Sequence, residues 1–109
     1  MDPWAQLTIL LPIKDRVPFT QRWLDYARHA GIACRILLAD GGADPGVHEM
    51  VAAATAGGLD VDYVRYPYDN DYARYYAKLA DALTRVTTPF VVLSDNDDLF
   101  MRATEEEDR

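Results

Sequence analysis

The sequence predicts an α/β fold: an open, mostly parallel sheet with helices on both of its faces. Short apolar runs alternate along the 109 residues with segments of helical periodicity. The helical segments begin near Pro or Asp and end at Gly or Pro, as helix boundaries do. Strands that alternate with helices are joined by right-handed crossovers, so neighbouring strands run parallel. No internal repeat or interior linker divides the chain, which indicates one folding unit.

The first half of the chain holds two pairs of a strand and a helix. Residues 7–13 are apolar and rich in strand-forming side chains, which predicts a buried first strand. Pro18 then opens an amphipathic helix that Gly31 ends. Residues 35–39 form the second apolar strand. The Asp44-Pro45 pair offers a cap and a first turn for a second helix, which a pair of glycines ends.

The second half repeats this order. Residues 60–66 alternate with the period of a strand and have one more polar face, which predicts a strand near a sheet edge. Apolar residues at helical spacing mark a third helix over residues 72–86, with Asp69 or Asp71 available as its cap. Residues 90–93 form a fourth apolar strand that runs directly into an acidic loop.

The charge balance excludes several kinds of partner. The chain has 18 acidic and 11 basic residues, a formal net charge of −7, which argues against binding to nucleic acid or anionic membranes. Cys34 is the single cysteine, so a disulfide within the chain and a zinc site built on paired cysteines are excluded. No apolar run approaches the roughly 20 residues of a transmembrane helix, and the N-terminus lacks the features of a signal peptide. We therefore expect a cytoplasmic protein.

The loops after the strands are the natural place for a ligand. In an open parallel sheet, ligands bind beyond the carboxyl ends of the strands, where loop amides and helix N-termini converge. After the fourth strand, residues 95–98 carry three carboxylates in four positions. A divalent cation would relieve their repulsion, and hard oxygen ligands favour Mg2+ or Mn2+. The alternative is that these acids cap a helix that begins near Leu99.

Three short motifs follow the first, second and fourth strands in this order: Pro12-Ile13-Lys14-Asp15, Ala39-Asp40-Gly41-Gly42 and Asp95-Asn96-Asp97-Asp98. They resemble the Pro-Thr-Tyr-Asn-like, Asp-Asp-Gly-Ser and Asp-Ala-Asp-Asp motifs of family-2 glycosyltransferases of the GT-A fold. That family transfers a sugar from a nucleotide diphosphate donor. The resemblance implies that residues 1–100 are a Rossmann-like, nucleotide-sugar-binding half-domain and that residues 101–109 are an acidic tail, which we expect to fray.

The resemblance also implies a site. Asp95 and Asp97 would hold Mn2+ or Mg2+ against the donor diphosphate, and the metal would neutralise charge that develops on the leaving nucleotide. Asp40 would accept a hydrogen bond from the base edge, and a UDP-sugar is favoured as donor. The residues implied to bind the donor are Pro12, Lys14, Asp15, Arg16, Asp40, Gly41, Lys78, Asp95 and Asn96.

Two positions depart from the family's pattern or leave a choice. Ala39 stands where the family often has a second acid, so the implied base contact depends on Asp40 alone. The family's third helix carries a cation near the donor. Arg74 and Lys78 are both candidates, and the spacing to Asp95 favours Lys78.

The same features have other interpretations. Asp40 before two glycines is a typical turn former, and residues 14–16 fit a solvated turn with a weak ion pair. The tyrosines between residues 66 and 76 would either stack on a ligand or fill the core and its rim. For the whole chain, the alternative is a non-catalytic α/β module, receiver-like or partner-binding, whose acidic loop binds Mg2+ or a protein. A magnesium-dependent phosphoryl-transfer fragment fits least, because the glycine-rich loop of such enzymes is missing.

Sugar transfer needs more than a donor site. In inverting members of the family, a carboxylate from the second half of the fold deprotonates the acceptor, so the catalytic base is expected beyond residue 109. The acceptor stays unknown. We expect the chain alone to bind donor weakly and to transfer sugar poorly or not at all. An uncovered sheet edge would also favour self-association.

Overall fold

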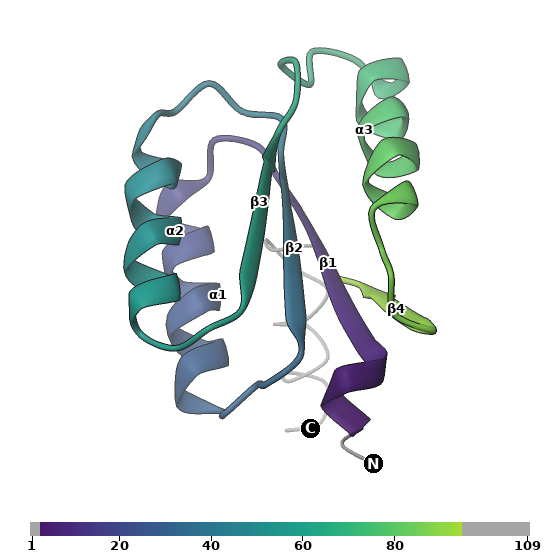
Figure 1. The fold of residues 1–109 in the computed structure, drawn as a ribbon. Helices are drawn as coiled ribbons and strands as arrows, with labels where there is room; N and C mark the ends of the chain where they lie inside the picture. The colour runs from purple at the N-terminus through teal and green to yellow at the C-terminus, as the bar shows by residue number, and fades with distance from the viewer. Residues whose placement is uncertain (1–2, 95–109) are drawn as a thin grey trace, which may run out of the picture.

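The structure is a computed structural model that describes residues 3–94. In chain order, its elements are the 3-10 helix η1 (Pro3–Gln6), β1 (Leu7–Ile13), α1 (Val17–His29), β2 (Arg35–Asp40), α2 (Gly46–Ala56), β3 (Val61–Arg65), α3 (Tyr72–Thr84) and β4 (Phe90–Leu93). The four strands are all parallel and lie in the order β3-β2-β1-β4 (Figure 1). The predicted α/β class with a parallel sheet is confirmed.

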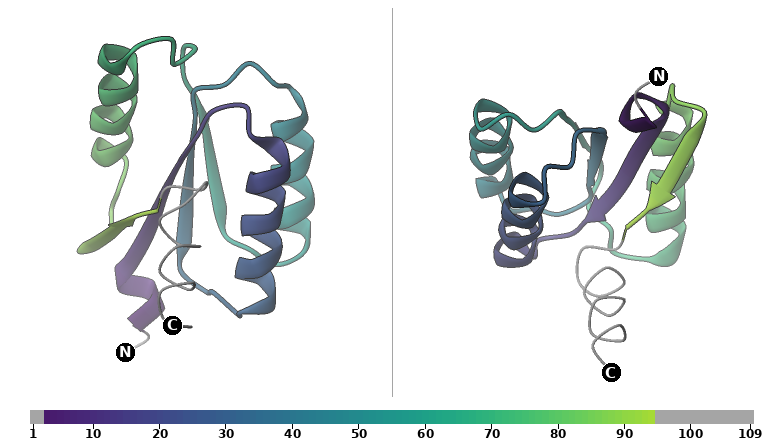
Figure 2. Two further views of the ribbon diagram at one scale, coloured as in Figure 1. Left: turned by 180° about the vertical axis from the view of Figure 1, so that it is seen from behind. Right: turned by 90° about the horizontal axis from the view of Figure 1, so that it is seen from below.

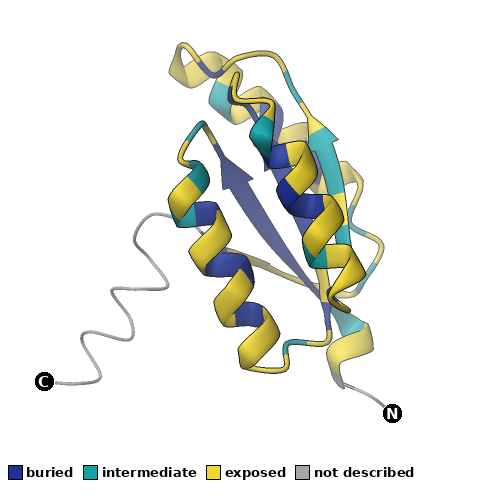
Figure 3. Cartoon of the chain, turned by 90° about the vertical axis from the view of Figure 1, so that its left-hand side faces the viewer, coloured by how far each residue is buried: buried dark blue, intermediate teal, exposed yellow. Residues whose placement is uncertain are grey.

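The two faces of the sheet are covered unequally. Helices α1 and α2 lie on one face and α3 on the other (Figures 1 and 2). Because alternate residues of a strand point to opposite faces, Leu11 and Leu38 pack with α1 and α2, whereas Leu10 and Leu37 pack in a smaller cluster under α3. Exposed and buried residues alternate along α1 and α2 (Figure 3), and the buried apolar ones pack in one cluster with residues of β1 and β2.

Pro12 sits near the end of β1, a central strand, where a proline removes one ladder hydrogen bond. The Leu10 carbonyl accepts from the Ser94 N–H at 2.9 Å, and the Ile13 carbonyl accepts from the Gly41 N–H at 2.9 Å. The backbone N–H and C=O groups of the even-numbered residues of β1 therefore point toward β4, and those of the odd-numbered residues point toward β2. Pro12 lies on the β4 side, beyond the last paired residue of β4, so its missing N–H leaves the ladder between β1 and β2 intact.

The first two helices follow the sequence pattern closely. α1 ends at His29, and two residues later Gly31 lies in the left-handed region with a φ of 71°. The Ile32 N–H donates to the Ala27 carbonyl at 3.0 Å. This is the Schellman arrangement that glycine favours. α2 begins at Gly46, one residue later than the pattern indicates, and Asp44 Oδ1 accepts from the Gly46 N–H at 2.8 Å.

Of the two residues that the sequence offers as the N-cap of α3, one takes this position in the structure. Asp71 caps the helix, because its Oδ1 accepts from the Arg74 N–H at 2.8 Å. Asp69, the other candidate, is buried in a different role. α3 also ends at Thr84, two residues before the predicted end.

The buried side of α3 is not the side that its apolar residues predict. Tyr72 is 81% exposed and Tyr76 is 63% exposed, although both belong to the apolar pattern that predicts the helix. Lys78 and Ala82 are the buried residues of this helix. The face that meets the sheet is therefore centred on a lysine and an alanine.

The two outer strands differ in their surroundings. β3 is an edge strand, as predicted from its more polar face. Among the strands of residues 3–94, β4 is the other edge and pairs only with β1. All four β4 residues are apolar and exposed, and Phe90 is the most exposed at 62%.

Within residues 3–94, none of the helices has the length and apolar character needed to cross a membrane. The acidic loop at residues 95–98 and the tail at residues 101–109 lie outside the described residues.

Candidate functional site

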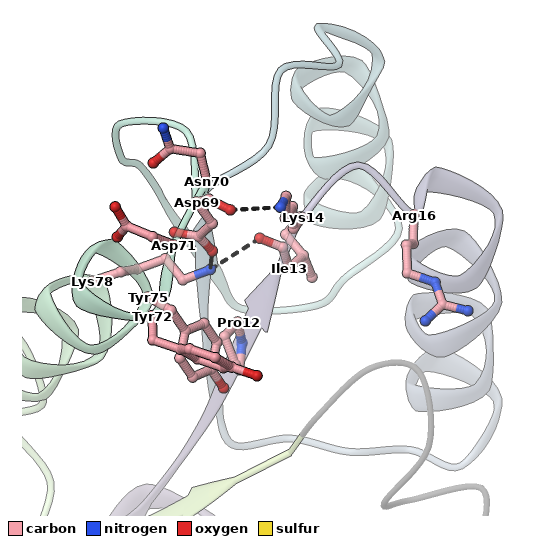
Figure 4. Close-up of a pocket in the computed structure, with 10 residues that line it drawn as sticks. All are labelled: Pro12, Ile13, Lys14, Arg16, Asp69, Asn70, Asp71, Tyr72, Tyr75 and Lys78. Carbon is pink, nitrogen blue, oxygen red and sulfur yellow. Dashed lines mark hydrogen bonds and ion pairs between the residues drawn. The ribbon is translucent and has the colours of Figure 1, made fainter.

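A pocket of about 510 Å³ opens at the carboxyl end of β1 (Figure 4). It lies between the loop that follows β1 and the first turns of α3. Its lining residues are Pro12, Ile13, Lys14, Arg16, Asp69, Asn70, Asp71, Tyr72, Tyr75 and Lys78. In the strand order β3-β2-β1-β4, the chain switches from one side of β1 to the other between β3 and β4. The carboxyl edge beside such a switch point is the usual ligand site of open α/β sheets.

The floor of the pocket holds a buried ion pair. The Lys78 ammonium contacts Asp69 Oδ2, and the two side chains are 1% and 4% exposed. The same ammonium donates to the Ile13 carbonyl at 3.2 Å, so it also reaches the end of β1. The charge of Lys78 is therefore compensated within the chain.

Lys14, in the loop after β1, also contacts Asp69. Its ammonium donates to the Asp69 carbonyl at 2.5 Å and lies 4.7 Å from the centre of the Tyr68 ring. The side chain is exposed, and three donors on one ammonium leave capacity for an anion. Arg16, also exposed, lies with its guanidinium 4.3 Å from the centre of the Phe19 ring.

Asp40 is fully buried, and both of its oxygens are engaged inside the protein. Oδ1 accepts from the Gly42 N–H at 2.8 Å, and Oδ2 accepts from the Tyr63 hydroxyl at 2.5 Å. Burial and this hydrogen bond to the carboxylate raise the pKa of Tyr63 to about 12. This arrangement supports the interpretation of Asp40 as a turn former. The contact to a base edge stays a prediction.

Asp15 joins the first loop to the second and does not line the pocket. It has a φ of 60°, and its Oδ1 accepts from the Ala43 N–H at 2.6 Å and from the Asp44 N–H at 3.0 Å. Gly42 lies directly against it, because a Cβ at that glycine would stand 2.5 Å from the Asp15 backbone nitrogen. The carboxylate of Asp15 therefore fixes the path of the loop between β2 and α2.

Gly41 belongs to the same packing. A Cβ at Gly41 would lie 2.5 Å from the carboxylate atoms of Asp69, so only glycine leaves room for that side chain. The role of Gly41 in this structure is to let the loop after β3 approach β2 closely.

The structure brings some of the predicted donor-binding residues together and separates others. Those that line the pocket are Pro12, Lys14, Arg16 and Lys78. Those that lie outside its lining are Asp15, Asp40 and Gly41. The remaining two, Asp95 and Asn96, fall outside the described residues, as does the second predicted metal ligand, Asp97.

None of the residues that the resemblance implies for donor binding lies in the loop after β3, although this loop lines the pocket. Asp69, Asn70 and Asp71 form one wall of the pocket, and Tyr72 and Tyr75 continue it along α3. The available signal was the position of this loop, which follows a strand at the carboxyl edge of the sheet.

No group of three or more His, Cys, Asp or Glu side chains that could hold a metal ion occurs within residues 3–94. The predicted ligands Asp95 and Asp97 follow Ser94, the residue directly after β4. The Ser94 N–H donates to the carbonyl of Leu10 in β1. Carboxylates after this strand have the oxygen chemistry that Mg2+ and Mn2+ require.

No protein-family model matches this chain, and no curated protein sequence matches it significantly.

Proposed function

We propose that this chain is the donor-binding part of a metal-dependent glycosyltransferase, which takes a sugar from a nucleotide diphosphate sugar. The observation that carries the proposal is the pocket at the carboxyl end of β1, beside the switch point of a sheet in the order β3-β2-β1-β4. Its volume of about 510 Å³ is in the range of small-molecule sites. The Asp95-Asn96-Asp97-Asp98 motif follows the neighbouring strand β4.

The residues of the pocket suit an anionic ligand with a ring. Lys14 and Arg16 are exposed cations on the loop after β1, and they would attract a diphosphate. Tyr72, at 81% exposure, offers an aromatic face on the opposite wall. Asp95 and Asp97 would hold Mn2+ or Mg2+, and that ion would stabilise negative charge on the leaving nucleotide. A UDP-sugar remains the favoured donor.

The strand order weighs against a receiver-like module. Receiver domains have a flavodoxin-like order in which the third strand lies beside the first. Here β3 lies beside β2, and β1 has β4 as its other neighbour. The order β3-β2-β1-β4 matches the first four strands of the dinucleotide-binding type of open sheet.

A titration of the purified chain tests the proposal. UDP and GDP are each added with and without Mn2+, and the heat of binding is measured for the wild type and for an Asp95→Ala, Asp97→Ala variant. We expect binding that needs Mn2+ and that the variant loses. The matched control is a Glu49→Ala, Asp62→Ala variant, which removes the same charge from exposed positions. Absence of binding by the folded wild type would contradict the proposal and favour a partner-binding module.

Two further properties belong to this proposal. Cys34 is a free and buried thiol whose burial raises its pKa, which suits a reducing compartment such as the cytoplasm. The exposed apolar strand β4 would support self-association of the chain through its open edge.

A further inference from the structure

Lys78 is an unusual cation among the described residues, because it is almost completely buried. It is 2% exposed, although it lies on a helix whose neighbouring residues are largely exposed. Its ammonium contacts Asp69 Oδ2 and donates to the Ile13 carbonyl at 3.2 Å, and the Tyr75 ring centre lies 5.2 Å away. Two of its three donors are thus used inside the protein. Figure 4 shows the ammonium turned toward Asp69 and Ile13.

Asp69 connects the loop after β3 to both central strands. Its N–H donates to the Gly41 carbonyl at 2.9 Å, at the end of β2, and its carbonyl accepts from Lys14 at 2.5 Å, just after β1. Its carboxylate lies against Gly41 in a space that a Cβ would fill. Within the described part of the chain, Oδ1 of this carboxylate is buried and has no hydrogen-bond partner. The carboxylate therefore depends on Lys78 for its compensation.

From these contacts we infer that Lys78 is a positioning residue that holds the loop of residues 67–71 against β1 and β2 through Asp69, and that it does not contact the ligand of the pocket. The loop and the start of α3 form one wall of that pocket. Removing Lys78 alone leaves a buried carboxylate without a counter-charge, which is strongly unfavourable, whereas removing both charges is often tolerated. The statement about the ligand rests on the proposed function, and the statement about the loop does not.

A rescue experiment separates positioning from ligand contact. The first variant, Lys78→Met, leaves the Asp69 carboxylate without a counter-charge. The double variant, Lys78→Met, Asp69→Asn, removes both charges at nearly constant volume. A Lys14→Met variant serves as the comparison for an exposed cation in the same pocket. The first readout is hydrogen exchange of the Asp69 and Gly41 amides, followed by NMR. The second is the affinity for UDP and GDP in the presence of Mn2+.

We expect Lys78→Met to speed exchange of the Asp69 amide about 100-fold and to weaken nucleotide binding, because the loop leaves β2. The double variant should return both readouts to within a few-fold of the wild type. Lys14→Met should weaken nucleotide binding while the Gly41 amide stays protected.

Two results would overturn the inference. One is an Asp69 amide that stays protected in Lys78→Met. The other is a double variant with a protected loop that binds nucleotide as weakly as the single variant, because Lys78 would then act on the ligand itself. Failure of Lys78→Met to fold supports the inference if the double variant folds, and contradicts it if the double variant is unfolded as well. If the wild type binds neither nucleotide, the proposed function fails, and the exchange of the Asp69 amide still decides the positioning role.

Discussion

Aspartates at the carboxyl edge of the sheet act mainly on their own chain. Asp15 holds the amides of the loop after β2, Asp40 holds a turn and a tyrosine, Asp69 pairs with a buried lysine, and Asp71 caps α3. Each of these carboxylates accepts charge-assisted hydrogen bonds, which are stronger than those between neutral groups. Asp69 and Asp71 therefore fix one wall of the pocket, and Asp15 and Asp40 fix the loop after β2.

The hydrogen bond from Tyr63 to Asp40 provides a test at this scale. We expect Tyr63→Phe to lower the free energy of unfolding by about 2 kcal/mol, because the buried Asp40 carboxylate loses one of its two donors. Urea unfolding at neutral pH measures this loss. Tyr76→Phe, at an exposed position, is the control and should change the free energy little. Equal effects of the two substitutions would contradict the assignment.

The same pair makes stability depend on pH in the alkaline range. Burial and Asp40 raise the pKa of Tyr63 to about 12, so the folded state favours the protonated phenol. A group with a raised pKa in the folded state adds stability below its unfolded pKa, near 10 for tyrosine, and loses it as the pH rises through the folded value. The difference in unfolding free energy between wild type and Tyr63→Phe should therefore be constant up to about pH 10 and shrink above it. A difference that grows with pH would show the opposite sign.

At the scale of elements, a local interaction determines where α3 begins, and a tertiary contact determines which of its sides is buried. Its start is fixed locally by Asp71, whose side chain accepts from the Arg74 N–H. Its rotation about its own axis is set by the contact of Lys78 and Ala82 with the sheet, and two tyrosines of the apolar pattern, Tyr72 and Tyr76, face outward. The apolar residues of α3 therefore predict correctly that a helix forms, but they do not predict which of its sides is buried.

The cap leads to a prediction for this helix. Asp71→Ala should lower the free energy of unfolding by about 1 kcal/mol, because one amide of the first turn loses its acceptor. Asp71→Asn keeps an acceptor and should restore most of the loss. Thermal unfolding of both variants measures the difference, with Asp62→Ala as a control for removal of an exposed charge. An Asn variant as unstable as the Ala variant would show that the charge, and not the cap, is responsible.

At the scale of the whole molecule, the two edges of the sheet formed by residues 3–94 differ in character. β3 carries two exposed charged residues, Asp62 and Arg65, as edge strands that avoid aggregation often do. β4 exposes four consecutive apolar residues, Phe90 to Leu93, and no strand within residues 3–94 pairs with its outer side. Unpaired strand edges with apolar side chains are templates for pairing with another chain.

We therefore expect the chain to self-associate through β4 as its concentration rises. Val92→Lys places a charge on this strand and should shift the equilibrium toward the monomer without unfolding the chain, because Val92 is 49% exposed. Sedimentation velocity over a concentration series measures the effect. A lysine at the similarly exposed Leu83, on α3, is the control. A wild type that stays monomeric up to its solubility limit would contradict the prediction.

The class of the fold and the position of nearly every element could be predicted from the sequence. Apolar periodicity, proline and glycine act within a few residues of where they stand, so the strands at residues 7–13 and 90–93 and the Gly31 end of α1 were predictable. The tertiary structure alone decided the strand order, the buried side of α3 and the partners of the aspartates. These depend on contacts between segments far apart in the chain, as between Asp69 and Lys14 or between Asp15 and Ala43. Local sequence carries no record of which distant group will compensate a buried charge, and so the pairing of Lys78 with Asp69 is known only from the fold.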